Sequence, residues 1–214
     1  MNIIFEGIDA VGKTTLINKL KNYLEISNKK SQIIKEIEEL PLKNVLTEML
    51  NKDPFFNSKK NFKTSIYETF LLAADFFYKQ EYFRGKKDII NIYDRDFLTI
   101  LCYQKIILEN EYSSNEINDF FDSFSNCLLF KLKKVDLLVY VYVPLEKSLE
   151  RIKERDNKIL NEKEIKFLKL SKNRFEKELI PKLEKNNINI ILINGEDSIE
   201  NNINKIIKKI NKEI

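Results

Sequence analysis

Gly7-Ile8-Asp9-Ala10-Val11-Gly12-Lys13-Thr14 is the stretch that decides the fold of this 214-residue chain. It fits the pattern G-x-x-x-x-G-K-[ST], and the apolar run Ile3-Ile4-Phe5 precedes it as a buried strand would. Behind it, Leu16, Leu20 and Leu24 recur at the spacing of one helical face. A strand, a glycine-bearing loop and a helix in this order predict a loop that binds phosphate.

The residue types of this loop suit the binding of ATP. Gly7 and Gly12 let the backbone close around phosphate oxygens, so that successive amides and the helix N-terminus point at negative charge. The Lys13 ammonium reaches the β- and γ-phosphates, and the Thr14 hydroxyl can bind Mg²⁺. The ATP-binding residues expected here are Gly7, Ile8, Asp9, Ala10, Val11, Gly12, Lys13, Thr14 and Thr15.

Composition excludes several other classes of protein. The chain has no histidine, which removes histidine-based catalysis and histidine metal ligands. Two cysteines, Cys102 and Cys127, suggest no disulfide framework and favour a reducing, cytoplasmic compartment. The net charge of +4 comes without basic residues interleaved with aromatic ones, so we expect no nucleic-acid partner. We expect no leader peptide and no membrane partner, because no apolar run approaches the ~20 residues of a membrane span.

Strand-like and helix-like segments alternate along the whole chain. The strand-like segments are 3–6, 31–37, 89–93, 137–143 and 188–193. Helix-like segments, among them 64–83, 162–183 and 198–210, fill the intervals, and 51–63 is polar and irregular. This alternation, together with the phosphate loop, predicts one α/β domain over residues 1–214, a three-layer α/β/α P-loop fold with a five-stranded parallel sheet. Ligands on such sheets bind beyond the carboxyl ends of the strands.

A second group of polar residues follows the strand predicted at 89–93. Asp94 supplies the carboxylate that a Mg²⁺ site usually takes beside substrate phosphates, so Thr14 and Asp94 are the expected metal-binding pair. Arg95 can grip a phosphate with two parallel hydrogen bonds. The end of this strand is therefore expected to face the phosphate loop.

Two arginines lie beside a polar break in the third quarter of the chain. Arg151 and Arg155 are one helical turn apart and share one face, just before the break at 156–161. We expect a short lid at about 153–163, and these arginines would neutralise charge on the transferred phosphate as the lid closes.

At these residues the chain resembles the thymidylate kinases, within the wider group of nucleoside and nucleoside-monophosphate kinases. The resemblance spans nearly the whole chain. Asp94-Arg95, Thr99 and Cys102-Tyr103-Gln104 keep the spacing of that family's Asp-Arg-Tyr, Ser and Ala-Tyr-Gln. Other matching segments are Phe5 to Asp9, Phe70 to Asp75, Leu149 to Ile152 and Arg174-Phe175.

The resemblance implies that the protein transfers phosphate from Mg·ATP to a nucleoside monophosphate, dTMP to dTDP above all. The catalytic residues would be Lys13, Asp9, Arg95, Arg151 and Arg155, with Mg²⁺ as the cofactor. The segment that contains Glu196 would pass near the adenine, which adds Glu196 to the ATP-binding residues. The resemblance also implies a homodimer.

The acceptor side departs from the family pattern. The residues expected to bind the acceptor are Asp9, Glu36, Phe70, Leu72, Phe76, Arg95, Thr99, Tyr103 and Gln104. However, Phe76 stands where relatives have a phosphate-reading Arg, and Asp96 stands where they have Tyr. Leu72 replaces the Phe that stacks on thymine, although Phe70 lies nearby. Losing one charged hydrogen bond costs about 1.5–3 kcal/mol, unless Lys35 or Lys79 compensates.

Two alternatives follow from these departures. The first alternative is a deoxynucleoside kinase, or a kinase of another small acceptor, in which an uncharged molecule with a hydroxyl accepts the phosphate. A general base helps such a reaction, and Glu36 is the candidate. It follows the second strand, where related deoxynucleoside kinases carry a Glu. The other alternative is a nucleotide-binding regulatory protein whose catalysis has decayed.

Overall fold

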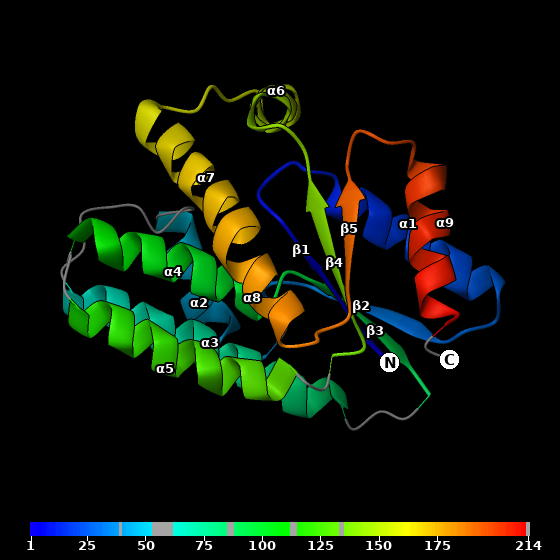
Figure 1. Ribbon diagram of the computed structural model, residues 1–214, viewed down its shortest axis with the longest axis horizontal. Helices are drawn as coiled ribbons and strands as arrows, with labels where there is room; N and C mark the ends of the chain where they lie inside the picture. The colour runs from blue at the N-terminus through cyan, green and yellow to red at the C-terminus, as the bar shows by residue number, and fades with distance from the viewer. Residues whose placement is uncertain (39, 53–61, 85–87, 112–114, 133–134, 213–214) are drawn as a thin grey trace.

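The fold is known from a computed structural model, which describes residues 1–38, 40–52, 62–84, 88–111, 115–132 and 135–212 (Figure 1). Most of the segment predicted to be irregular, 53–61, lies outside the described residues. Among the described residues, no helix combines the length and the apolarity needed to cross a bilayer.

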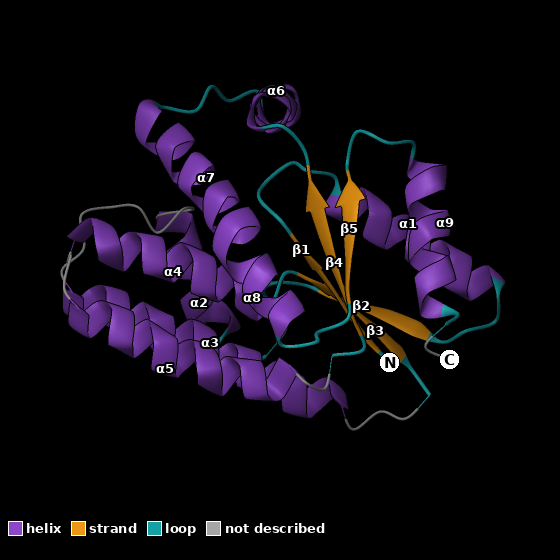
Figure 2. Cartoon of the chain, in the orientation of Figure 1, coloured by secondary structure: helices purple, strands orange, loops and turns teal. Residues whose placement is uncertain are grey.

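A five-stranded parallel sheet forms the middle of the molecule, as predicted (Figure 2). Its order is β2-β3-β1-β4-β5, so the strand that leads into the phosphate loop is central and buried. The strands are β1 (Asn2–Glu6), β2 (Ser31–Ile34), β3 (Ile90–Asp94), β4 (Leu137–Tyr142) and β5 (Ile190–Asn194). Because β2 ends at Ile34 rather than at residue 37, Lys35 and Glu36 lie beyond its carboxyl end, in the region where ligands bind.

Helices cover both faces of this sheet and complete the three predicted layers. The helices α1 and α9 lie together on one side, whereas α3, α4, α5, α7 and α8 lie on the other (Figure 2). The bounds are α1 (Lys13–Ile26), α2 (Lys43–Lys52), α3 (Phe62–Arg84), α4 (Phe97–Glu111), α5 (Asn115–Leu132), α6 (Leu145–Asp156), α7 (Glu162–Arg174), α8 (Ile180–Lys185) and α9 (Ile199–Ile210).

The helix predicted at 162–183 is present, since the chain is helical from Glu162 to Lys185, but it is not α-helical throughout. A π-helical turn at Phe175–Leu179 separates α7 from α8. Pro181, at the start of α8, has no amide hydrogen to donate within a regular helix, which gives a physical reason for the break.

The helix α3 is apolar on more than one face. Ala73 and Phe76 are buried, whereas Tyr67, Phe70, Tyr78 and Tyr82 are each about half exposed. We call these four side chains the aromatic face of α3. A row of exposed aromatic side chains is uncommon on a monomer and is typical of an interaction surface.

Candidate active site

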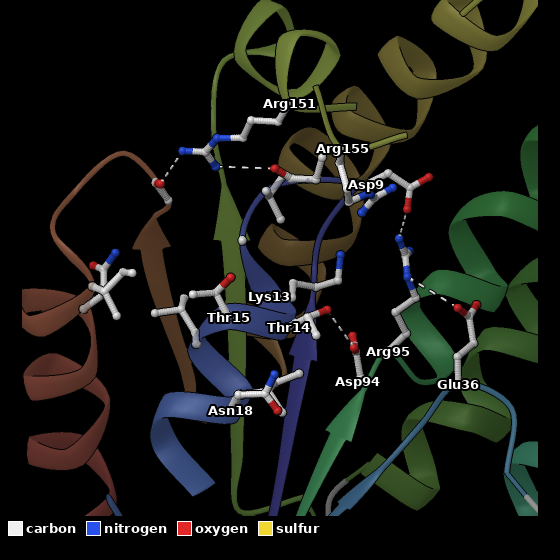
Figure 3. Close-up of a pocket in the computed structure, with 18 of the residues that line it drawn as sticks. Asp9, Lys13, Thr14, Thr15, Asn18, Glu36, Asp94, Arg95, Arg151 and Arg155 are labelled. Carbon is white, nitrogen blue, oxygen red and sulfur yellow. Dashed lines mark hydrogen bonds and ion pairs between the residues drawn. The ribbon is translucent and has the colours of Figure 1, made fainter. Parts of the chain in front are cut away.

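One cavity of about 1160 Å³ lies at the carboxyl ends of the strands, where the fold predicts a ligand site. Its lining comes from the phosphate loop, the chain beyond β2 and β3, the helix α6, and the loop between β5 and α9 (Figure 3). The predicted site residues that line it are Asp9, Ala10, Val11, Gly12, Lys13, Thr14, Thr15, Glu36, Asp94, Arg95, Arg151 and Arg155.

The phosphate loop has the backbone that its glycines predict. Gly7 and Gly12 have φ angles of 140° and 104°, which side chains other than hydrogen rarely permit. A Cβ on Gly7 would also lie 2.2 Å from the carbonyl oxygen of Val141 on β4. Ala10 has a φ of 56°, which is strained for a residue with a Cβ, and such strain is commonly stored at functional sites.

Lys13 lies inside this loop. Its Nζ donates hydrogen bonds to the carbonyl oxygens of Gly7 and Ile8 at 2.9 and 2.8 Å. Burial, followed by the charge of Arg95, lowers the pKa of Lys13 to about 8. The lysine is therefore charged at neutral pH, and its ammonium lies where a phosphate would be cradled.

The predicted metal pair comes together at the mouth of the loop. The Thr14 hydroxyl donates to an oxygen of Asp94 at 3.2 Å, although the two residues are 80 positions apart in the chain (Figure 3). Hydroxyl and carboxylate oxygens are ligands that Mg²⁺ prefers, usually with substrate phosphates completing its shell. The donor set therefore fits a magnesium ion brought by ATP.

Arg95 is the centre of charge in the part of the cavity beyond β2 and β3, where the acceptor is expected; we call this part the acceptor half. Arg95 is 8% exposed, its Nη2 pairs with Asp9, and its Nε lies 3.5 Å from the carboxylate of Glu36 (Figure 3). Its Nη1 donates to the Tyr103 hydroxyl at 3.1 Å and lies 3.5 Å from the Thr99 hydroxyl. One guanidinium thus joins the phosphate loop, the chain beyond β2, and α4.

The two arginines of α6 have different environments. Arg151 donates to the carbonyl oxygens of Gly195 at 2.9 Å and Ala10 at 3.4 Å, so it bridges the β5–α9 loop to the phosphate loop. Arg155 makes two hydrogen bonds of 2.7 Å to its neighbour Asp156, at the edge of the cavity.

Several predicted acceptor residues lie outside the cavity lining. Phe76 is 2% exposed and packs against Phe97 with ring centroids 6.0 Å apart, so it belongs to the core. Phe70 is 53% exposed and packs edge-on against Phe120 of α5, with ring centroids 6.0 Å apart. The predicted acceptor residues that do not line the cavity are Phe70, Leu72, Phe76, Thr99, Tyr103 and Gln104.

Three predicted ATP-binding residues do not line this cavity either. Gly7 and Ile8 lie within the loop, beneath the residues that border the cavity. Glu196 borders a separate cavity of about 510 Å³ that is lined by Tyr140, Tyr142 and Leu192 on the sheet.

Two residues that hold the site together were not predicted for that role. Lys79, which was expected to compensate for a missing arginine, is 4% exposed and bonded to Asp75 at 3.0 Å and to the carbonyl oxygen of Glu36 at 2.8 Å. Ser148 is fully buried and donates to the carbonyl oxygen of Asp9 at 2.7 Å. The signal in the sequence that could have identified Lys79 is a charged residue within an apolar helix.

A family model described as deoxynucleoside kinase matches residues 3–214. The chain belongs to the deoxynucleoside kinase family. It is therefore a kinase, as predicted, and the identity of its acceptor stays a prediction.

Comparison with individual proteins adds two observations. The chain is 32% identical over 217 residues to the thymidylate kinase of Campylobacter hominis, which covers 100% of this chain and 97% of the relative. It is 26% identical over 161 residues to the probable thymidylate kinase of Sulfurisphaera tokodaii, covering 75% of this chain and 73% of that relative.

Solved structures support the fold. A structure of deoxyadenosine kinase from M. mycoides with bound dATP superposes with a TM-score of 0.67, covering 99% of this chain and 100% of that one. Sequence identity to it is 20%, so the likeness concerns the fold alone. The predicted five-stranded α/β/α fold is confirmed.

Proposed function

We propose that this protein transfers the γ-phosphoryl group of ATP to the 5′-hydroxyl of a deoxynucleoside, with Glu36 as the general base. The observation that carries this proposal is the carboxylate of Glu36 in the cavity, 3.5 Å from the Arg95 guanidinium. A hydroxyl acceptor must lose its proton as it attacks phosphorus, and a carboxylate within reach of it can accept that proton. The match to the deoxynucleoside kinase family over residues 3–214 supports the same acceptor class.

The electrostatics of the acceptor half favour an uncharged substrate. Arg95 already neutralises two carboxylates, those of Asp9 and Glu36. A monophosphate would add negative charge beside these groups, and like charges at short range are unfavourable. Lys79 cannot offset it without leaving Asp75, because the two form a buried ion pair.

The proposed reaction uses residues from both halves of the cavity. Lys13 and the loop amides hold the phosphates of ATP, while Thr14 and Asp94 would hold Mg²⁺, which neutralises phosphate charge when bound. Glu36 takes the proton of the 5′-hydroxyl as the new O–P bond forms. The bond from the γ-phosphorus to the bridging oxygen breaks, and ADP leaves. Arg151 and Arg155 face the leaving side from α6.

A second candidate is thymidylate kinase, which was the first prediction from the sequence. The relative from Campylobacter hominis, 32% identical over the whole chain, favours it. In that reaction the attacking group is already a phosphate oxygen, so Glu36 would have no role as a base. Arg95 would release one of its carboxylate partners and bind the acceptor phosphate instead. Lys35, which also lines the cavity, would supply the second cation.

One experiment separates these candidates. ADP release from Mg·ATP is measured with deoxyadenosine, deoxycytidine, thymidine and dTMP, and Lys13→Ala serves as the blank. We expect a nucleoside to be phosphorylated, and Glu36→Gln to lower kcat by about 10²–10⁴-fold, the usual contribution of a general base. Turnover of dTMP alone, unaffected by Glu36→Gln, would refute the proposal and establish the second candidate. ATP binding without turnover of any acceptor would favour a regulatory protein.

A further inference from the structure

Arg95 is held in a backbone conformation that its side chain disfavours. Its φ is 66°, in the left-handed region, where residues with a Cβ are strained. A strained residue persists only when its surroundings fix it from several sides. The amide of Arg95 donates to the carbonyl oxygen of Phe5 at 3.0 Å, which ties it to the end of β1. The next residue of β1, Glu6, makes further hydrogen bonds to the residues that follow Arg95.

Glu6 is a fully buried carboxylate directed at the turn that contains Arg95. One of its oxygens accepts from the amides of Asp96 at 3.0 Å and Thr99 at 3.3 Å. The other accepts from the Thr99 hydroxyl at 2.6 Å. These are the amides at the start of α4, which begins at Phe97, so Glu6 caps this helix from a neighbouring strand.

The residue that would ordinarily cap α4 is used elsewhere. Asp96 directly precedes the helix, but its carboxylate accepts from Gln80 of α3 at 2.9 Å. The free N-terminus of α4 therefore relies on Glu6. The side chain of Asp96 thus joins α3 to the turn and does not cap α4.

Thr99 links Glu6 to the guanidinium itself. Because its hydroxyl hydrogen is given to Glu6, its oxygen is left to accept from Nη1 of Arg95, at 3.5 Å. Glu6 thus restrains Arg95 in two ways, through the backbone turn and through an oriented hydroxyl. Neither contact touches the cavity, since Glu6 is fully buried beneath it.

We propose that Glu6 is a positioning residue for phosphoryl transfer, which fixes the strained turn after β3 and thereby aims Arg95 at the acceptor. The proposal rests on the place of Arg95 in the acceptor half of the site. It predicts that Glu6 affects the acceptor and leaves ATP binding alone, because the contacts of Lys13, Thr14 and Arg151 with their partners do not involve Glu6.

The test uses Glu6→Gln, which keeps the shape of the side chain and removes its charge. At pH 8, we expect kcat/KM for the acceptor to fall by about ten- to a hundred-fold, the range for one charged hydrogen bond, while KM for ATP changes less than twofold. Thr99→Val breaks the same link with Glu6 in place and is expected to act in the same direction. The control is Asn91→Ala, which removes a buried polar side chain of β3 that bonds to Asn2 rather than to the turn.

A double-variant cycle decides whether Glu6 acts through Arg95. If it does, Glu6→Gln has no further effect in an Arg95→Ala background. An equal additional loss in that background, or a parallel rise in KM for ATP, would overturn the proposal. If Arg95→Ala leaves the acceptor kinetics unchanged, the proposed roles of Arg95 and Glu6 both fail. If Arg95→Ala lowers kcat/KM for the acceptor but Glu6→Gln does not, only the positioning role of Glu6 is refuted.

Discussion

Replacing Gly7 with alanine tests how the phosphate loop is packed, and Gly12 provides a matched control. Both residues have positive φ, 140° and 104°, so either alanine should cost about 1–3 kcal/mol of backbone strain. Only Gly7 has a steric conflict in addition, since its Cβ would lie 2.2 Å from the Val141 carbonyl oxygen. At Gly12 the nearest neighbour of the new Cβ is Nη1 of Arg151 at 3.9 Å, an ordinary contact.

The overlap at Gly7 has to be relieved by moving the loop away from β4. Overpacking of this kind costs about 1–3 kcal/mol more, which places the melting temperature of Gly7→Ala about 2–12 °C below that of Gly12→Ala. Thermal unfolding of both variants, followed by circular dichroism, measures the difference. The rise in melting temperature at saturating ATP is expected to shrink more for Gly7→Ala. If Gly7→Ala melts at or above Gly12→Ala, the loop is not packed against β4 as described.

Three further predictions concern charge and assembly. Lys79→Met should lower the free energy of unfolding by about 3–5 kcal/mol, because it leaves the buried Asp75 unpaired, and urea denaturation should show recovery in the double variant Asp75→Leu/Lys79→Met. Burial raises the pKa of Glu6 to about 7, so the native state keeps a proton that the unfolded state releases near pH 4.5. The urea concentration at the unfolding midpoint should therefore decrease as the pH is raised from about 5 to about 7.5, and it should decrease less in Glu6→Gln. The aromatic face of α3 should pair with that of a second copy of the chain. Light scattering is expected to give a dimer for the wild type and for the control Lys19→Glu, and a monomer for Tyr78→Glu. A monomeric wild type would contradict this prediction.

The parts of the site that could be predicted from the sequence are those whose residues are neighbours in the chain. The phosphate loop, its flanking strand and helix, and the pair Asp94-Arg95 each lie within a short segment, so their spacing carried the information. The five-stranded parallel sheet could also be predicted, because strands that alternate with helices allow few arrangements. The meeting of Thr14 with Asp94 followed from that arrangement.

The rest depends on contacts between distant segments. Nothing near Glu6 in the chain indicates that it caps α4, and nothing near Lys79 indicates that it holds the backbone of Glu36. Phe70 was expected at the acceptor because of the resemblance to the thymidylate kinases, and periodicity could not correct this, since α3 is apolar on several faces. The helix at 162–183 was continuous in the pattern of apolar residues, which does not register a π-turn.

The strand order has a consequence for how the protein is made. The central strand β1 leaves the ribosome before the other four strands of the sheet, yet its partners are late: Asn2 pairs with Asn91 of β3, and Ile3 with Leu137 of β4. Until β4 has been synthesised, one edge of β1 has no partner strand, and such exposed edges favour aggregation. The phosphate loop also packs on β4 through Gly7, so it cannot assume its final shape before about two-thirds of these residues have been synthesised. Nascent chains stalled before residue 137 should therefore fail to bind ATP, although they contain the entire phosphate-binding sequence.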